Sequence, residues 1–180
     1  GISAVGVCLL HSYANRKHEK LIRDIFRNEF PECEISISSL VCPEPGEYDR
    51  AITTLLDSFI KPHVKNYLDK SSDKIQEKYK EIPFLIMKSN GGVAPNEKIA
   101  KKPISTVLSG PAAGALSASY LGRISGREKL ITLDGGGTST DIAVIENSEA
   151  KKSSNHSIGS FYLKIPMIDI TTIGTGGGSV

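Results

Sequence analysis

The chain has 180 residues, of which 39% are hydrophobic and 23% charged, and its formal net charge is +2. This is the composition of an ordinary globular protein with enough residues for a sizeable core. The small net charge does not indicate a nucleic-acid partner. No apolar stretch approaches the roughly 20 residues that cross a bilayer, so we expect no membrane span.

The cysteines indicate a cellular compartment, and the two ends of the sequence indicate whether it is part of a longer protein. Cys8, Cys33 and Cys42 are odd in number and do not have the spacing of a zinc site. We interpret them as reduced structural thiols, which favours a cytoplasmic protein. The sequence does not start with Met, has no recognisable signal peptide and finishes in loop-forming residues. We therefore expect a fragment of a longer protein.

The first part of the chain predicts alternating strands and helices. The apolar run at residues 4–10 is typical of a strand buried on both faces. Asn15 can cap a helix that runs to about Glu29 with its apolar side chains on one face. Residues 34–38 predict a second strand. Strand, helix and strand at this spacing form a β-α-β unit, which implies a parallel sheet.

A long helical segment follows. Residues 47–79 predict a helix with an interruption or kink at Pro62. Residues 61–102 contain ten lysines against five acidic residues, which we interpret as a solvated face, with a basic docking surface as the alternative. Another buried strand is expected at 83–87, and a turn at 89–92.

The later elements lead to the most informative segment. A short extended segment at 103–108 precedes a helix of small residues that has Pro111 at its first position and runs to about Gly122. Strands are predicted at 130–133, 142–145, 150–154 and 161–165, and short turns between them favour antiparallel pairing. A boundary between lobes near 122–129 divides the chain into residues 1–125 and 126–180.

The stretch LDGGGTSTD at residues 133–141 carries the strongest chemical signal. Glycines lack a Cβ, so successive backbone N–H groups can converge on a phosphate. Asp134 follows a strand and would repel a phosphate, but it can reach one through Mg²⁺. It can also orient or deprotonate an attacking water.

Other interpretations of this stretch are weaker. It lacks the GKS or GKT ending of a Walker loop, and a strand follows where a Rossmann loop has a helix. A simple hairpin turn needs only one or two such residues. The sequence therefore predicts a phosphate loop that requires a metal.

The order of strand, glycine loop and antiparallel strand after a small-residue helix resembles the second phosphate motif of the actin-like ATPase superfamily. Further blocks are similar to those of the hydantoinase A family, which includes N-methylhydantoinase A, ATP-dependent 5-oxoprolinase and a subunit of acetone carboxylase. The blocks are HSYAN with HE (11–19), PE with EYDR and TT (43–54), MKSNGG (87–92), LSGPAAG (108–114), GGTSTD (136–141), and Pro166-Met167-Ile168-Asp169 with IGTGGGS (173–179).

Three positions depart from the family pattern. Gly135 stands where the family usually has a bulkier residue, Lys88 where it usually has Gln, and Arg16 where it often has Pro. We expect Gly135 to loosen the loop without removing its N–H donors. Lys88 would alter substrate choice if it faced the cleft, and Arg16 would change only a helix start.

The resemblance implies an α/β actin-like ATPase (ribonuclease H-like) fold with parallel and mixed sheets and flanking helices, of which only part is present. It implies ATP and Mg²⁺ as cofactors, with Asp134 catalytic and near the metal. Asp141 would either join the metal ligands or tie the loop. The implied nucleotide-binding residues are Gly135, Gly136, Gly137, Thr138, Ser139, Thr140, Gly176, Gly177 and Gly178. His11 would contact substrate or, equally, serve a structural role, and Asn90 would orient a ligand or close a turn.

The implied activity is ATP-dependent hydrolysis of a small cyclic amide by phosphorylation of its oxygen, with a B-type partner subunit. An ATP-dependent ketone carboxylase subunit is one alternative, and a non-enzymatic, chaperone-like nucleotide switch is another. No DxGGT-like block precedes residue 134, so the first phosphate motif of the superfamily is missing. We therefore expect the isolated 180 residues to be catalytically inactive.

Overall fold

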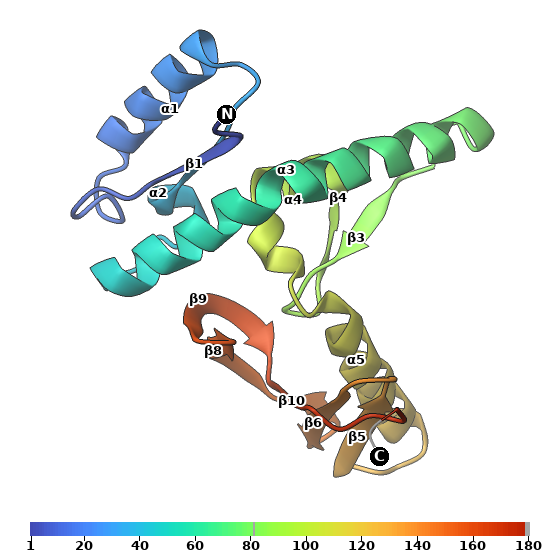
Figure 1. Cartoon of the computed structure of the whole chain (residues 1–180). Helices are drawn as coiled ribbons and strands as arrows, with labels where there is room; N and C mark the ends of the chain where they lie inside the picture. Colours follow the sequence, from blue (N-terminus) through green and yellow to red (C-terminus); the bar gives the residue numbers. More distant parts are fainter. Residues whose placement is uncertain (81, 179–180) are drawn as a thin grey trace. The chain divides into compact units, whose positions relative to one another are not determined.

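The computed structural model describes residues 1–80 and 82–178, which divide into two units (Figure 1). The first unit contains residues 1–86, 94–105 and 157–165, and the second contains residues 87–93, 106–156 and those from 166 onward. The division expected from the sequence, into residues 1–125 and 126–180 of two lobes, stays a prediction. In the described part, no helix is long and apolar enough to cross a membrane.

The β-α-β unit predicted at the start of the chain is confirmed. Strands β1 (Ala4–Val7) and β2 (Glu34–Ile37) pair in parallel, and helix α1 (Lys17–Glu29) connects them. The Asn15 side chain accepts a hydrogen bond from the Lys17 N–H at 3.1 Å, close to its predicted capping role. A short helix, α2 (Ser38–Val41), follows β2 directly.

Burial of β1 and β3 is lower than predicted. β1 ends at Val7, and its residues are half-buried or exposed. β3 (Leu85–Met87), expected to be a buried strand, begins with the exposed Leu85 and pairs with β4 (Val93–Pro95). In the β1–β2 sheet the buried strand is β2, because α1 and α3 both pack against it.

Helix α3 (Glu47–Lys78) is continuous through Pro62, so of the predicted interruption or kink the interruption does not occur, and the kink stays a prediction. Proline removes one backbone donor from a helix, but tertiary bonds hold the preceding turn in place. The buried Lys61 ammonium donates to the backbone carbonyls of Ile35 and Lys101, each at 3.0 Å. These bonds attach α3 to β2 and to helix α4 (Asn96–Lys101).

Asp57 lies one turn before Lys61 and is also buried. Its carboxylate accepts hydrogen bonds from the Ser36 hydroxyl at 2.6 Å and the Ile104 N–H at 3.0 Å, and lies 3.7 Å from the Lys61 ammonium. Burial raises the pKa of Asp57 and lowers the pKa of Lys61, because each loses hydration of its charged form.

The segment after α4 is a 3₁₀ helix, Pro103–Thr106, and not the extended segment expected at 103–108. Two side-chain bonds favour the tighter conformation. The Ser105 hydroxyl donates to the Lys102 carbonyl at 2.7 Å, and the Ile104 N–H is held by Asp57. These tertiary contacts override the local sequence pattern.

A buried carboxylate joins three segments of the first unit. Glu19, on α1, accepts hydrogen bonds from the Leu9 N–H at 2.8 Å, the Ser38 hydroxyl at 2.7 Å and the Ser39 N–H at 2.7 Å. Burial alone would raise the pKa of Glu19, but these hydrogen bonds outweigh burial and hold the pKa below its ordinary value. The ionised carboxylate therefore stabilises this part of the fold.

Arg50 completes the same cluster from α3. Its fully buried guanidinium donates to the Leu9 carbonyl at 3.1 Å, to the Ser38 hydroxyl at 2.5 Å and to the Ser12 hydroxyl. It also pairs with Glu47 at 2.9 Å. The HSYAN…HE and EYDR blocks of the sequence thus meet in one hydrogen-bonded cluster.

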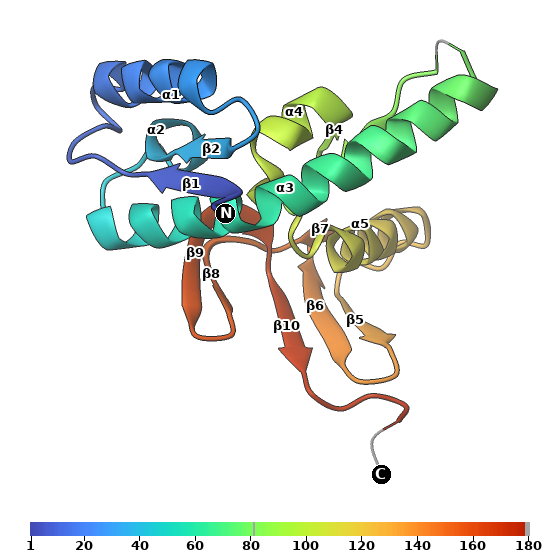
Figure 2. The ribbon, with the colours of Figure 1, turned by 45° about the horizontal axis from the view of Figure 1, so that its top comes forward.

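The second unit consists of helix α5 and an antiparallel sheet. Its elements are α5 (Ser109–Ile124), β5 (Leu130–Gly135), β6 (Thr140–Glu146), β7 (Glu149–Ala150) and β10 (Ile170–Ile173). A separate two-stranded sheet, β8 (Lys152–Ile158) and β9 (Phe161–Ile168), has its residues 157–165 in the first unit. The sheet order is β10-β6-β5, with β7 also pairing with β6 (Figure 2). Ala112 and Ala115 of α5 pack with Ala143, Ile145 and Ile168 in its core.

Helix α5 begins two residues earlier than predicted. Leu108, with φ +60°, precedes the first helical residue, Ser109, so Pro111 is the third position and not the first. Proline is tolerated there because N–H groups of the first turn have no partner within the helix. The small residues of α5 let the sheet approach closely.

Replacing Glu19 with Gln should lower the free energy of unfolding by about 1–3 kcal/mol, because an amide leaves one buried donor without an acceptor. Glu19 has a lowered pKa in the folded state, so its contribution is fully present above the ordinary pKa of 4.5. It is lost as the pH falls through the folded-state pKa. Urea unfolding of both proteins at about pH 7 and about pH 3 measures the effect.

Glu29→Gln, at the exposed end of the same helix, is the matched control and should be nearly neutral. Equal losses of unfolding free energy in the two variants would contradict the stabilising role of the Glu19 carboxylate. The same holds if the loss in Glu19→Gln is as large at about pH 3 as at about pH 7.

Candidate functional site

The LDGGGTSTD stretch forms the β5–β6 hairpin. The strands pair antiparallel, and Asp134 lies directly opposite Asp141. The Gly136 N–H donates to the Ser139 carbonyl at 2.8 Å and closes the turn. The stretch is therefore a hairpin, and its phosphate-binding role stays a prediction.

The second glycine segment lies against this loop. Gly177 donates its N–H to the Gly136 carbonyl at 2.9 Å, and Gly178 donates to the Gly137 carbonyl at 2.8 Å. Strand β10, paired with β6, carries the chain to this position. The structure thus brings together the two predicted glycine segments, 135–137 and 176–178, while Ser179 of the same block lies outside the described residues.

The glycines of the two segments have different physical reasons to be glycine. A Cβ on Gly176 would lie 2.6 Å from the Thr138 nitrogen and 2.7 Å from the Gly136 oxygen, so packing excludes a side chain there. A Cβ on Gly137 would meet nothing within 4 Å, and one on Gly136 would be 3.5 Å from its nearest neighbour. Neither has a positive φ. The fold itself therefore does not require glycine at 136 or 137.

The same loop has unused donors. Within the described part of the chain, the backbone N–H groups of Gly137, Thr138 and Ser139 have no acceptor. Gly137 and Thr138 are exposed. Adjacent N–H groups on a loop without side-chain obstruction can bind an anion. The N–H groups of Gly177 and Gly178, by contrast, are occupied by the loop.

A pocket of about 170 Å³ adjoins this loop. Pro111, Gly114 and Ala115 of α5 line one side, and both Asp134 and Asp141 line it as well. Small-molecule sites typically measure roughly 300–1,000 Å³. The pocket suits a phosphate group or a hydrated metal ion and is too small for a whole nucleotide.

The two carboxylates, Asp134 and Asp141, are too few to hold a metal that takes all its ligands from protein side chains, but they suffice for Mg²⁺. Asp141 accepts a hydrogen bond from the Thr172 hydroxyl at 2.5 Å on one oxygen, Oδ1. Among the described residues there is no group of three or more His, Cys, Asp or Glu side chains that could hold a metal. Mg²⁺ commonly uses one or two carboxylates together with phosphates and waters.

Thr172 is a site residue that sequence reasoning missed. Its side chain fixes Asp141 because β10 and β6 place the two residues opposite each other. The ITTI pattern predicts a strand, but sequence alone does not give its partner or register. The spacing between residues 141 and 172 carries no signal of contact.

His11 lies in the first unit, in an exposed turn with φ +55°. Its backbone N–H donates to the Glu47 carboxylate at 3.2 Å, and its ring Nδ1 lies 3.2 Å from the Tyr13 hydroxyl. The hydrogen bond from His11, assisted by Arg50, holds the pKa of Glu47 below its usual value. His11 is therefore both structurally bonded and accessible, and its contact with substrate stays a prediction.

The SNGG block closes a turn. Asn90 Oδ1 accepts the Gly92 N–H at 3.0 Å, which supports the structural alternative for Asn90. Gly91 has φ +84°, and a Cβ there would lie 2.6 Å from the Leu116 side chain of α5. The half-buried Lys88 side chain runs beside Gly92, and its effect on substrate choice stays a prediction.

Residues 50–180 match the hydantoinase/oxoprolinase family. The chain belongs to this family. It is 33% identical to the acetophenone carboxylase gamma subunit of Aromatoleum aromaticum, over 100% of this chain and 25% of that protein. The resemblance on which the sequence expectations depended is confirmed.

Two solved structures of similar proteins share the mixed α/β fold. Nucleotide-free acetone carboxylase, whose mechanism is described as ATP-dependent, is 29% identical with a TM-score of 0.85, over 97% of this chain and 25% of its own. The ATP-dependent caprolactamase of Pseudomonas jessenii is 27% identical with a TM-score of 0.84, over 98% of this chain and 26% of its own. The chain spans about a quarter of the length of these family members.

Gly176→Ala should displace the loop at 136–138, because its Cβ would overlap the Thr138 nitrogen. Amide chemical shifts of residues 136–140 are expected to change. Gly174→Ala is the matched control, since a Cβ at that position meets nothing within 4 Å. Unchanged shifts in Gly176→Ala, or equal shifts in both variants, would show that the two segments do not depend on each other.

Proposed function

We propose that the protein containing these residues is an ATP-dependent hydrolase of a small cyclic amide, and that the loop from Asp134 to Asp141 holds phosphate groups of Mg-ATP. The observation that carries the proposal is the pair of glycines, 136 and 137, which the fold does not require and which adjoin unused N–H donors. Close approach of a ligand explains them. The ATP-dependent caprolactamase, a similar protein, supports the amide substrate.

Each residue then has a distinct role at the phosphate groups. The N–H groups of Gly137, Thr138 and Ser139 bind phosphate oxygens, with Gly135, Gly136 and Thr140 shaping the loop. Asp134 and Asp141 hold Mg²⁺, and Asp134 also orients the attacking water. Gly176 permits the close packing of the 176–178 segment, which keeps the loop in position.

The bound nucleotide supplies the phosphoryl group that turns a poor amide electrophile into a reactive one. Fixed donors at the loop would stabilise the charge that develops on the transferring group, without reorganisation during the reaction. His11 would contact the substrate. We further propose that the complete protein has the actin-like two-lobed fold, works in the cytoplasm and binds a B-type partner subunit.

A ketone carboxylase subunit is the second candidate. Acetophenone carboxylase and acetone carboxylase resemble the chain as closely as the caprolactamase does. Both activities would use the same phosphate loop and differ in the substrate and the partner. The chaperone-like switch is disfavoured because these three relatives are enzymes by name.

Asp134→Asn in the intact protein should lower phosphate release from Mg-ATP by about 100-fold or more, because the variant loses a metal ligand and a group that orients water. The assay compares hydantoins, 5-oxoproline, lactams and ketones, with and without the partner subunit. Glu146→Gln, an exposed change on β6, is the control. Full activity of Asp134→Asn would refute the assignment, and turnover with ketones and bicarbonate alone would favour the carboxylase.

Thr172→Val should weaken the affinity for Mg-ATP by about tenfold, because Asp141 loses the hydrogen bond that orients it. Thr172→Ser restores the hydroxyl and should recover most of the affinity. Titration with Mg²⁺ at fixed ATP measures the change. Equal behaviour of the Val and Ser variants would indicate that Thr172 acts through packing and not through Asp141.

A further inference from the structure

A second pocket, in the first unit, has the opposite electrostatic character from the one beside Asp134. Its volume is about 180 Å³, and four basic residues line it: Arg23, Arg27, Lys61 and Lys101. They come from α1, α3 and α4. No acidic residue lines the pocket, and its remaining lining is apolar, including Ile37 and Val41.

Two of the four cations have no counter-charge. In the described part of the chain, the side chains of Arg27 and Lys101 make no hydrogen bond or ion pair. Arg23 donates through Nε and Nη2 to the mostly exposed Asp24, at 2.9 and 2.8 Å. Such a surface pair contributes little and leaves Nη1 of Arg23 unused.

Lys61 contributes charge to the pocket but no free donor. Its buried ammonium already bonds to Ile35, Ser36 and Lys101. The carboxylates nearest to it are also occupied, since Asp57 lies 3.7 Å from Lys61 and Glu34 pairs with Lys65 at 2.5 Å. The uncompensated positive charge at the pocket therefore comes from Arg27 and Lys101.

This arrangement has an energetic cost in the absence of a ligand. Arg23 and Arg27 are one helical turn apart, where like charges destabilise a helix. Lys101 adds a third cation from another helix. An anion in the pocket would reverse this repulsion, and guanidinium groups bind the oxygens of carboxylates and phosphates with well-defined geometry.

We propose that this pocket binds a small oxyanion, a phosphate or a carboxylate, through Arg23, Arg27 and Lys101. The apolar wall accommodates a short organic body attached to the anionic group. None of the residues that line the pocket belongs to the glycine loop, and the proposal does not rest on the function proposed above.

Equilibrium dialysis of the intact protein with inorganic phosphate, and separately with acetate, tests the proposal at constant ionic strength set with chloride. Arg27→Gln combined with Lys101→Gln should bind one equivalent less than the unmodified protein, or bind it about tenfold or more weakly. Both side chains belong to exposed residues, and thermal unfolding checks that the variant is folded.

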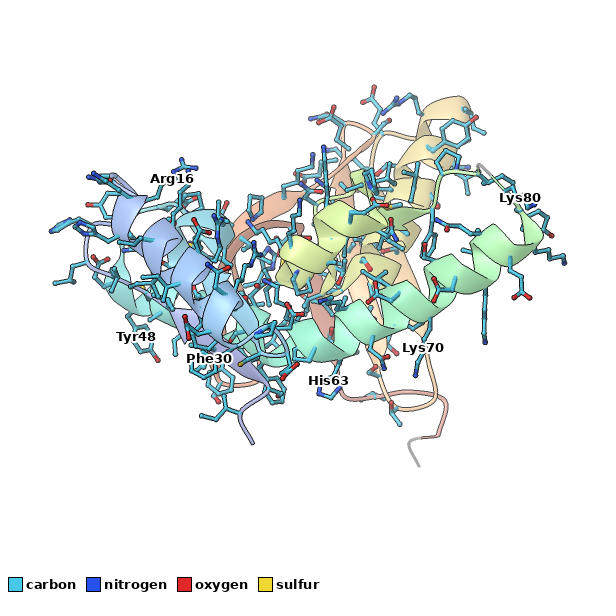
Figure 3. All side chains as sticks on the ribbon, turned by 90° about the horizontal axis from the view of Figure 1, so that it is seen from above. Arg16, Phe30, Tyr48, His63, Lys70 and Lys80 are labelled. Carbon is cyan, nitrogen blue, oxygen red and sulfur yellow. The ribbon has the colours of Figure 1, made fainter. Side chains whose placement is uncertain are left out.

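Lys70→Gln is the matched control, because Lys70 is an exposed lysine on α3 that does not line the pocket (Figure 3). It should bind as the unmodified protein does. If the double variant loses binding of phosphate alone, the ligand class is phosphate esters, and if it loses binding of acetate alone, the class is carboxylates. Loss of binding of both anions supports the wider class of oxyanions. Identical binding by the double variant and the unmodified protein overturns the proposal, as does absence of binding to either anion.

Discussion

Strand β6 is hydrogen-bonded on both edges, and the candidate site depends on this pairing. β5 on one edge brings Asp134 opposite Asp141, and β10 on the other brings Thr172 opposite the same residue. The same pairing carries the 176–178 segment to the glycine loop. Two segments that are distant in sequence, the β5–β6 hairpin and the stretch from β10 to Gly178, are thus held in fixed register by backbone hydrogen bonds.

The first unit has a comparable dependence on buried charge. Glu19 and Arg50 are fully buried, and their partners are mainly backbone groups and serine hydroxyls of other segments. The buried Nε of Arg50 has no hydrogen-bond partner among the described residues. A buried charge is costly unless such partners surround it. Ser12, Glu19 and Arg50 of the HSYAN…HE and EYDR blocks therefore have a structural role that does not depend on catalysis.

Elements that depend on periodicity and on the placement of glycines along a short stretch of sequence were predicted well. The β-α-β unit, the 130–145 hairpin and the small-residue helix are confirmed, because each follows from periodicity and glycine placement. The helix that continues through Pro62, and the 3₁₀ helix in place of the extended segment expected at 103–108, both occur where Lys61, Asp57 and Ile104 make tertiary bonds. The contact of Thr172 with Asp141 also depends on strand register, which composition does not encode.

The bond from Lys61 to the Ile35 carbonyl has a consequence for the side of β2 that faces away from β1. Glu34 donates its N–H to Ser3, on the β1 side, so the polar groups of Ile35 point to the opposite side of the strand. Ile35 is buried, and a buried carbonyl without a donor would cost free energy. The Lys61 ammonium binds this carbonyl, so a side chain supplies the donor that a neighbouring strand supplies inside a larger sheet.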